Sequence, residues 1–235
     1  MSKLRFLTGN ALKIIAALLM LIDHIGVFLF PDILVFRYIG RLSFPLFAFM
    51  ISEGARYTKN KINYVLGIAS LAIFCQTVAY FYDNGNRNMS ILVTFTLSLL
   101  IIFALQNFKK DFYLKDKKGA LTAAWLLIFT VYLTFLFTVF ISVDYGFIGV
   151  LVPVFASLFD FRGIDAPEKI KRLDNLCVRV LCMGVALVIL ASLCAKYQYL
   201  SLLAASTFIT VFRKPRTVKY QIFLLRILPY SHFCA

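Results

Sequence analysis

Two adjacent ionisable residues, Asp23 and His24, lie inside a long apolar stretch near the start of the 235-residue chain. An ionisable side chain within a bilayer costs at least about 2.5 kcal/mol on insertion scales, so such residues usually mark a functional site. Neighbouring helix residues point about 100° apart, so we expect one side chain to reach a cavity and the other to bind or orient within the bundle. Imidazole titrates near neutrality, which suits His24 to proton transfer. The alternative is a structural hydrogen bond between helices.

Lys13 precedes His24 by almost three helical turns. Both side chains are therefore expected on one face, about 16 Å apart along the helix axis. That spacing would suit a long ligand with an anionic end at Lys13 and a reactive end at His24. The alternative is that Lys13 only extends to the lipid headgroups.

Arg41 and Glu53 lie at the two ends of the next apolar stretch. Pro45 lacks an amide donor, which predicts a kink and a freed carbonyl near Arg41. Arg41 is either a site residue or an interfacial anchor. Glu53 is expected to support the site or to pair with Arg56 or Lys13.

Asp144 and Tyr145 form a tight turn before a later apolar stretch and are candidates for supporting the site. Asp144 is expected to cap the helix that follows, by accepting a hydrogen bond from an orphan amide. Arg179 is expected either to pair with a buried carboxylate or to extend toward the headgroups. No Gly-rich phosphate loop and no His/Cys cluster occurs in the sequence, so no metal site is predicted. The five cysteines are expected to be free thiols.

The composition places the chain in a membrane. Hydrophobic residues make up 61% and charged residues 15%, with a mean hydropathy of +0.85, against roughly 45–50% and 25% in soluble domains. We predict a single all-α transmembrane domain over residues 1–235, a polytopic helical bundle of about eight helices. The predicted spans are Leu12–Phe30, Phe36–Ser52, Ile62–Phe81, Ile91–Phe108, Ala120–Val143, Tyr145–Phe159, Leu176–Ala195 and Tyr199–Phe212, with an incomplete ninth at Tyr220–Pro229.

The basic residues that give the chain its formal net charge of +14 lie mainly in the loops between these spans. Lys and Arg are abundant in every second loop and at the N-terminus, whereas the intervening loops hold few. By the positive-inside rule, this alternation predicts a cytoplasmic N-terminus in a bacterial cytoplasmic membrane. Because the basic residues lie between apolar segments rather than along one face, we expect membrane lipids as partners and no nucleic acid.

Several segments resemble the TraX family of membrane proteins, named for the conjugation-plasmid protein that N-acetylates pilin. The resemblance is specific over the first sixty residues and weaker beyond, at Thr94 and from Asp144 onward. The strongest segments are Leu12–Ala16, Met20–Gly26, Gly40–Phe49 and Glu53-Gly54. Family members also end in a Tyr-Pro-x-His element, whereas this chain has Pro229-Tyr230-Ser231-His232, so His232 is not carried over.

The resemblance implies an integral membrane acyltransferase that moves an acetyl group from cytoplasmic acetyl-CoA to a hydroxyl or amine at the membrane. On this reading Lys13 approaches the donor's phosphates and His24 is the general base. Arg41 and Asp23 position substrate or stabilise charge, and no metal takes part. The acceptor stays open among a peptide, a pilin and a glycan. The alternatives are a proton-coupled transporter and a non-catalytic assembly factor.

Overall fold

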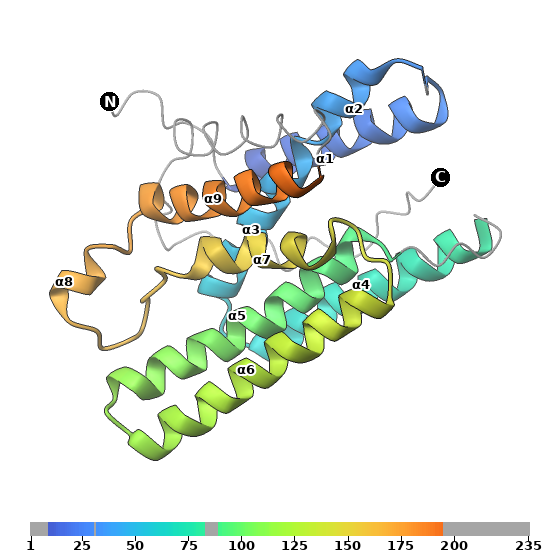
Figure 1. Ribbon diagram of the computed structural model, residues 1–235. Helices are drawn as coiled ribbons and strands as arrows, with labels where there is room; N and C mark the ends of the chain where they lie inside the picture. The colour runs from blue at the N-terminus through green and yellow to red at the C-terminus, as the bar shows by residue number, and fades with distance from the viewer. Residues whose placement is uncertain (1–8, 31, 83–88, 195–235) are drawn as a thin grey trace.

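The computed structural model describes residues 9–30, 32–82 and 89–194, and all regular elements in these ranges are helices (Figure 1). The predicted spans before residue 195 are mainly helical, whereas the predicted spans from residue 199 onward, and His232, lie outside the described residues. The helices are α1 (Gly9–Phe28), α2 (Leu34–Gly40), α3 (Ser43–Tyr57), α4 (Lys61–Tyr82), α5 (Ile91–Tyr113), α6 (Lys117–Phe140), α7 (Gly146–Ser157), α8 (Glu168–Lys171) and α9 (Leu176–Cys194).

Four of these helices, α1, α4, α5 and α6, are long and apolar enough to cross a bilayer. Helices α7 and α9 are shorter apolar helices. With 12 residues, α7 extends only about 18 Å, less than the ~30 Å hydrocarbon core of a bilayer. The predicted span Tyr145–Phe159 is therefore a central packing helix that does not cross the membrane unaided. The chain is a membrane protein with a helical bundle.

The second predicted span, Phe36–Ser52, is not one kinked helix. Helix α2 ends at Gly40, a turn holds Arg41 and Leu42, and α3 begins at Ser43. Pro45 is the third residue of α3, in the first turn, where an amide has no intrahelical partner to lose. The proline therefore lies at a new helix start, and the break upstream leaves Arg41 outside helical geometry.

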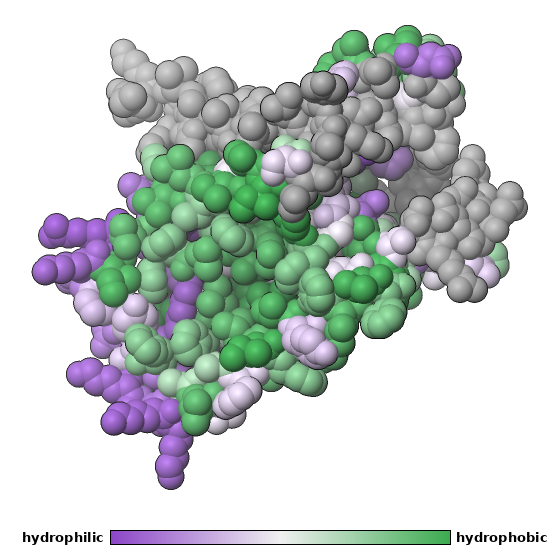
Figure 2. Space-filling model, viewed as in Figure 1, coloured by the Kyte–Doolittle hydropathy of each residue, from purple (hydrophilic) through white to green (hydrophobic). Residues whose placement is uncertain are grey.

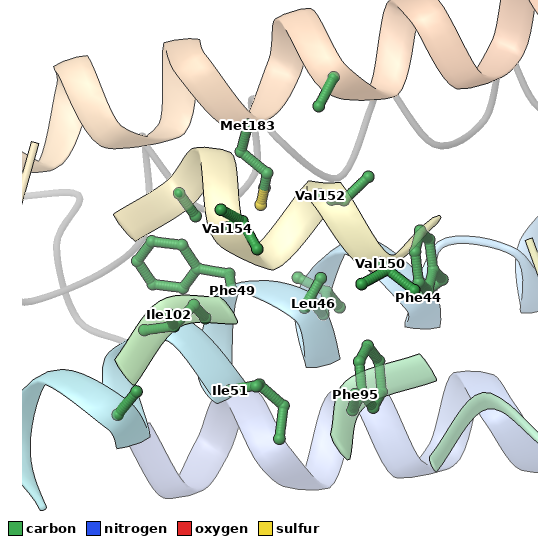
Figure 3. Close-up of a cluster of buried hydrophobic side chains, with 14 of the residues drawn as sticks. Phe44, Leu46, Phe49, Ile51, Phe95, Ile102, Val150, Val152, Val154 and Met183 are labelled. Carbon is green, nitrogen blue, oxygen red and sulfur yellow. The ribbon is translucent and has the colours of Figure 1, made fainter. Parts of the chain in front are cut away.

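The core surrounds α7. This helix packs against α3, α5, α6 and α9, and α3 also contacts α1 and α5. Phe44, Phe49 and Met183 are completely buried, and they interdigitate with Val152 of α7 and Ile102 of α5 (Figure 3). This packing fixes the two ends of α3, near Arg41 at its start and Glu53 close to its end.

The outer surface separates apolar flanks from a hydrophilic end. Figure 2 shows hydrophobic side chains over the flank of the bundle and hydrophilic ones gathered at the end that carries α8 and the α5–α6 turn. Exposed apolar side chains such as Phe74 of α4 and Trp125 of α6 suit contact with lipid tails. This distribution matches a membrane-embedded flank, and the cytoplasmic position of the N-terminus stays a prediction.

Candidate functional site

Asp23 and His24 point in different directions from α1, as their spacing predicts. Asp23 is half-buried and lies against Gly40 of α2, where an added Cβ would overlap the Asp23 side chain. His24 is exposed. Asp23 is thus the member of the pair that contacts the neighbouring helix, and the absence of a side chain at Gly40 allows this close approach.

The tautomer of His24 follows from its hydrogen bond. The ring Nδ1 lies 2.8 Å from the carbonyl oxygen of Met20, one turn earlier on the same helix. A carbonyl oxygen only accepts, so Nδ1 must carry the proton of this hydrogen bond. In the neutral ring, Nε2 then holds the lone pair. The basic nitrogen of His24 is therefore the one directed away from its own helix.

Lys13 and His24 lie on one uninterrupted helix, and both side chains are exposed. The buried face of α1 is formed by Leu12 and Ala16, followed further along by half-buried Asp23. The residue spacing places Lys13 and His24 on a common side of the helix, about 16 Å apart along its axis. This arrangement agrees with the predicted stripe.

Arg41 is joined to Tyr145. Its Nη1 donates a 2.7 Å hydrogen bond to the phenolic oxygen, and the Tyr145 ring stacks on Phe44 with 4.1 Å between centroids. Tyr145 has a φ of 62°, a left-handed conformation that is uncommon for a bulky residue and is often found at functional sites. This backbone conformation directs the phenol between Arg41 and Phe44.

Asp144 does not cap the helix that follows it. The N-cap residue of α7 is Tyr145, without a side-chain cap. The Asp144 carboxylate instead lies near the backbone amide of Ile91, the first residue of α5. Thr94 Oγ1 donates to the Asp144 carbonyl oxygen at 2.9 Å. The expected cap was wrong because the α6–α7 turn folds over the start of α5.

Four of the predicted site residues therefore lie at one end of the bundle. The charges of Asp23 and Arg41 both act on Asp144 and on Tyr145. We name Asp23, Arg41, Asp144 and Tyr145 the Arg41 cluster. Its members come from α1, the α2–α3 turn and the turn before α7, so the fold joins segments that are distant in sequence. The α1 member, Asp23, is the sequence neighbour of His24.

Glu53 does not belong to this cluster, because it lies about 18 Å further along α3. Its carboxylate forms a buried ion pair with Arg179 of α9. Arg179 is 2% exposed and also donates to Ser52 Oγ at 3.2 Å and to the Ala156 carbonyl oxygen at 2.9 Å. Of the two alternatives for Arg179, the buried carboxylate partner is the one found. For Glu53, the sequence predicted a pair with Arg56 or Lys13, and the buried partner found is Arg179.

Arg56 instead joins α3 to the segment between α7 and α9. It donates to the two carboxylate oxygens of Asp174 at 2.6 and 2.9 Å and lies 3.5 Å from Asp160. Burial raises the pKa of the Asp160 carboxyl above its ordinary value, and the Arg56 guanidinium opposes this shift. These contacts fix the end of the bundle opposite the Arg41 cluster.

Lys109 was missed by sequence reasoning. Its Nζ donates to three carbonyl oxygens just beyond the end of α7, those of Ser157 at 3.0 Å, Leu158 at 2.6 Å and Asp160 at 3.3 Å. It thereby satisfies acceptors left open where a helix ends. The helical spacing of Phe95, Ser98, Ile102 and Lys109 is the signal that assigns this lysine to the buried face of α5.

In the part of the chain that the structure describes, no group of three or more His, Cys, Asp or Glu side chains could hold a metal ion. The described cysteines Cys75, Cys177 and Cys182 are free thiols.

The sequence matches the profile of the family described as "TraX protein" over residues 8–234. The chain belongs to the TraX family. It is also 31% identical, over 104 residues, to an uncharacterized protein of Rickettsia prowazekii (strain Madrid E). That alignment covers 44% of this chain and 40% of the relative. No solved structure matches the chain.

In this TraX family member, three of the segments that carry the family resemblance meet in space. The Met20–Gly26 segment lies on α1, the Gly40–Phe49 segment includes the α2–α3 turn, and Asp144 follows α6. The Arg41 cluster brings these segments together, with Thr94 bonded behind Asp144. These three segments thus lie at the same end of the bundle, whereas Glu53-Gly54 lies toward the opposite end of α3.

Proposed function

We propose that this TraX family member is an integral membrane acyltransferase that moves an acetyl group from acetyl-CoA to a hydroxyl or amine acceptor at the membrane. The observation that carries the proposal is the convergence of Arg41, Asp144 and Tyr145 on Asp23, the neighbour of His24. Such a set of charges and donors at one end of a membrane bundle is costly, and it suits a site where charge develops during a reaction.

In the proposed reaction, Nε2 of His24 removes the proton of the acceptor hydroxyl or amine. The acceptor oxygen or nitrogen attacks the thioester carbonyl carbon, and a bond forms between them. The carbon–sulfur bond then breaks, and the CoA thiolate leaves and takes up the proton from His24. The Arg41 guanidinium stabilises the negative charge on the carbonyl oxygen, and Asp23 positions the substrate.

Lys13 is assigned to the donor. Its ammonium lies about 16 Å along α1 from His24, toward the N-terminal end, and would bind the phosphates of acetyl-CoA. With the N-terminus in the cytoplasm, the donor reaches Lys13 from the cytoplasmic side. The basic loops predicted on that side would attract the anionic donor.

The experiment uses the full-length protein reconstituted in lipid nanodiscs with radiolabelled acetyl-CoA. Peptide, pilin and glycan acceptors are supplied in turn, and release of the CoA thiol is measured together with acceptor labelling. We expect labelling that requires both donor and acceptor and that is lost in Arg41→Gln but kept in the exposed control Lys117→Gln. Substrate flux into proteoliposomes without any acyl donor, and without CoA release, would favour a transporter instead.

A further inference from the structure

A large pocket opens beside the Arg41 cluster, between α4 and α6. Both helices pack against α5 but not closely against each other, and the space between them has a volume of about 970 Å³. Ala69 and Tyr80 of α4 both line it, so it extends roughly 16 Å along the helix axis. It is therefore an elongated groove, with α5 as its floor, within three of the membrane-spanning helices.

Several polar side chains that line this groove are already hydrogen-bonded within the protein. Thr77 donates its hydroxyl to the Ile73 carbonyl oxygen at 2.8 Å, and Thr96 donates to Leu92 at 2.9 Å, each on its own helix. Gln76 accepts a hydrogen bond from the Ser90 amide at 3.0 Å. These bonds occupy the two threonine hydroxyls and the Gln76 carbonyl oxygen within the protein, and most of the other lining residues are apolar, so the groove offers its occupant mainly hydrophobic contact. A hydrocarbon chain is the ligand with these requirements.

One end of the groove adjoins the Arg41 cluster directly. Met89 and Ser142 line the groove, and the Met89 amide donates to the Ser142 carbonyl oxygen at 2.8 Å. The next bond in the same pairing runs from the Asp144 amide to the Met89 carbonyl oxygen at 3.2 Å. The backbone pairing that forms this part of the groove wall thus continues to Asp144 of the Arg41 cluster. Exposed aromatic side chains, Tyr80 and Phe140, lie at this end, as is typical near a membrane interface.

We infer that this groove holds the hydrocarbon tail of a lipid-linked acyl acceptor, whose polar head then reaches the Arg41 cluster. The inference rests on the proposed acyltransferase function and narrows its acceptor to a molecule with a single long apolar chain. A hydrocarbon tail that lies between α4 and α6 leaves the membrane interior beside Asp144. Its head group therefore emerges where the reactive residues converge.

The first test measures occupancy of the groove and needs no activity. The full-length protein in nanodiscs is irradiated with palmitate that carries a diazirine near the chain end, and labelled peptides are mapped by mass spectrometry. We expect labelling on the groove face of α4 that is lost in Ala69→Phe, which fills the groove, and reduced in the smaller change Ala69→Leu. The control Gly67→Leu adds bulk to α4 where an added Cβ meets no atom, and it keeps the labelling.

The second test compares matched acceptors with and without a tail: glucosamine with its hexadecyl glycoside, and a short peptide with its palmitoylated form. We expect the tailed acceptor to have a KM about tenfold lower or more. Ala69→Phe should remove that advantage while acetylation of the tail-free acceptor is unchanged. Equal KM values, or labelling that Ala69→Phe leaves unchanged, would overturn the inference. Groove labelling without acetylation of any acceptor would contradict the proposed function and keep only a chain-binding groove.

Discussion

Arg41 and Tyr145, 104 positions apart in sequence, are joined by a 2.7 Å hydrogen bond from the guanidinium to the phenolic oxygen. The bond links the break between α2 and α3 to the turn before α7. It also fixes the direction of the Arg41 side chain, because the Tyr145 ring is itself held by stacking on Phe44. Arg41 is thereby oriented before any substrate binds.

Tyr145→Phe removes only the hydroxyl and keeps the stacked ring. We expect kcat for acetyl transfer to fall by about 10-fold to 100-fold, because a misplaced donor stabilises the transition state less well. The loss of one hydrogen bond costs only about 1 kcal/mol of stability, so the thermal unfolding temperature in detergent should change little. The exposed residue Tyr132 supplies the control, Tyr132→Phe. Unchanged kcat in Tyr145→Phe would show that Arg41 needs no such orientation.

The buried Glu53–Arg179 pair is predicted to be structural. Removing one partner leaves an uncompensated buried charge, so Glu53→Ala and Arg179→Ala should each lower the free energy of unfolding by about 3–5 kcal/mol. The double variant Glu53→Leu/Arg179→Met should recover much of that loss, since neither charge is then left alone. The measurement is unfolding in mixed detergent micelles, with exposed Glu168→Ala as control. A double variant as unstable as the sum of the single ones would refute the pairing.

Gly40→Ala tests the close approach of α1 and α2. An added Cβ would overlap Asp23, and overpacking of this kind typically costs about 1–3 kcal/mol. We expect a lower unfolding temperature and, because Asp23 shifts, a lower rate of acetyl transfer. Gly67→Ala on α4 meets no neighbouring atom and should be neutral. If Gly40→Ala behaves like Gly67→Ala, then α1 and α2 do not pack in this way.

The pH dependence of stability can be tested at Asp160, beyond the end of α7. Burial raises the pKa of its carboxyl in the folded protein, although Arg56 opposes the shift. The folded state then holds the proton more tightly than the unfolded state, so this contribution to stability is lost as pH rises through the folded pKa. We expect the unfolding temperature of the wild type, relative to Asp160→Asn, to decrease from about pH 4 upward. Exposed Asp165→Asn should show no such trend, and an increase with pH would contradict the assignment.

The membrane helices could be predicted from the sequence because each depends only on the length of its own run of apolar residues. The break at Arg41 could not be placed in the same way. Pro45 predicts a disturbance, but whether the helix kinks or restarts depends on how closely Gly40 packs on Asp23, a contact between two helices. The shortness of α7 was also missed, since a buried core helix and a spanning helix are equally apolar.

The site residues were found because ionisable side chains in apolar segments are conspicuous, but their partners were not predictable. Asp144 lies against the start of α5 instead of capping α7, and Glu53, expected to pair with Arg56 or Lys13, forms its buried ion pair with Arg179 of α9. In both cases the residue found lies on an element that the sequence pattern did not indicate. Buried charges form pairs across a bundle, and those distances are set by tertiary packing.

The most direct test of the account is acetyl transfer by His24→Ala, measured with radiolabelled acetyl-CoA and the full-length protein in nanodiscs. The matched control is Leu21→Ala, an exposed residue of the same helix. The account predicts that His24→Ala lowers kcat by about 100-fold to 10,000-fold, the range for loss of a general base. It also predicts that Leu21→Ala keeps wild-type activity and that both variants stay folded. Acetyl transfer unchanged in folded His24→Ala would contradict the proposed mechanism.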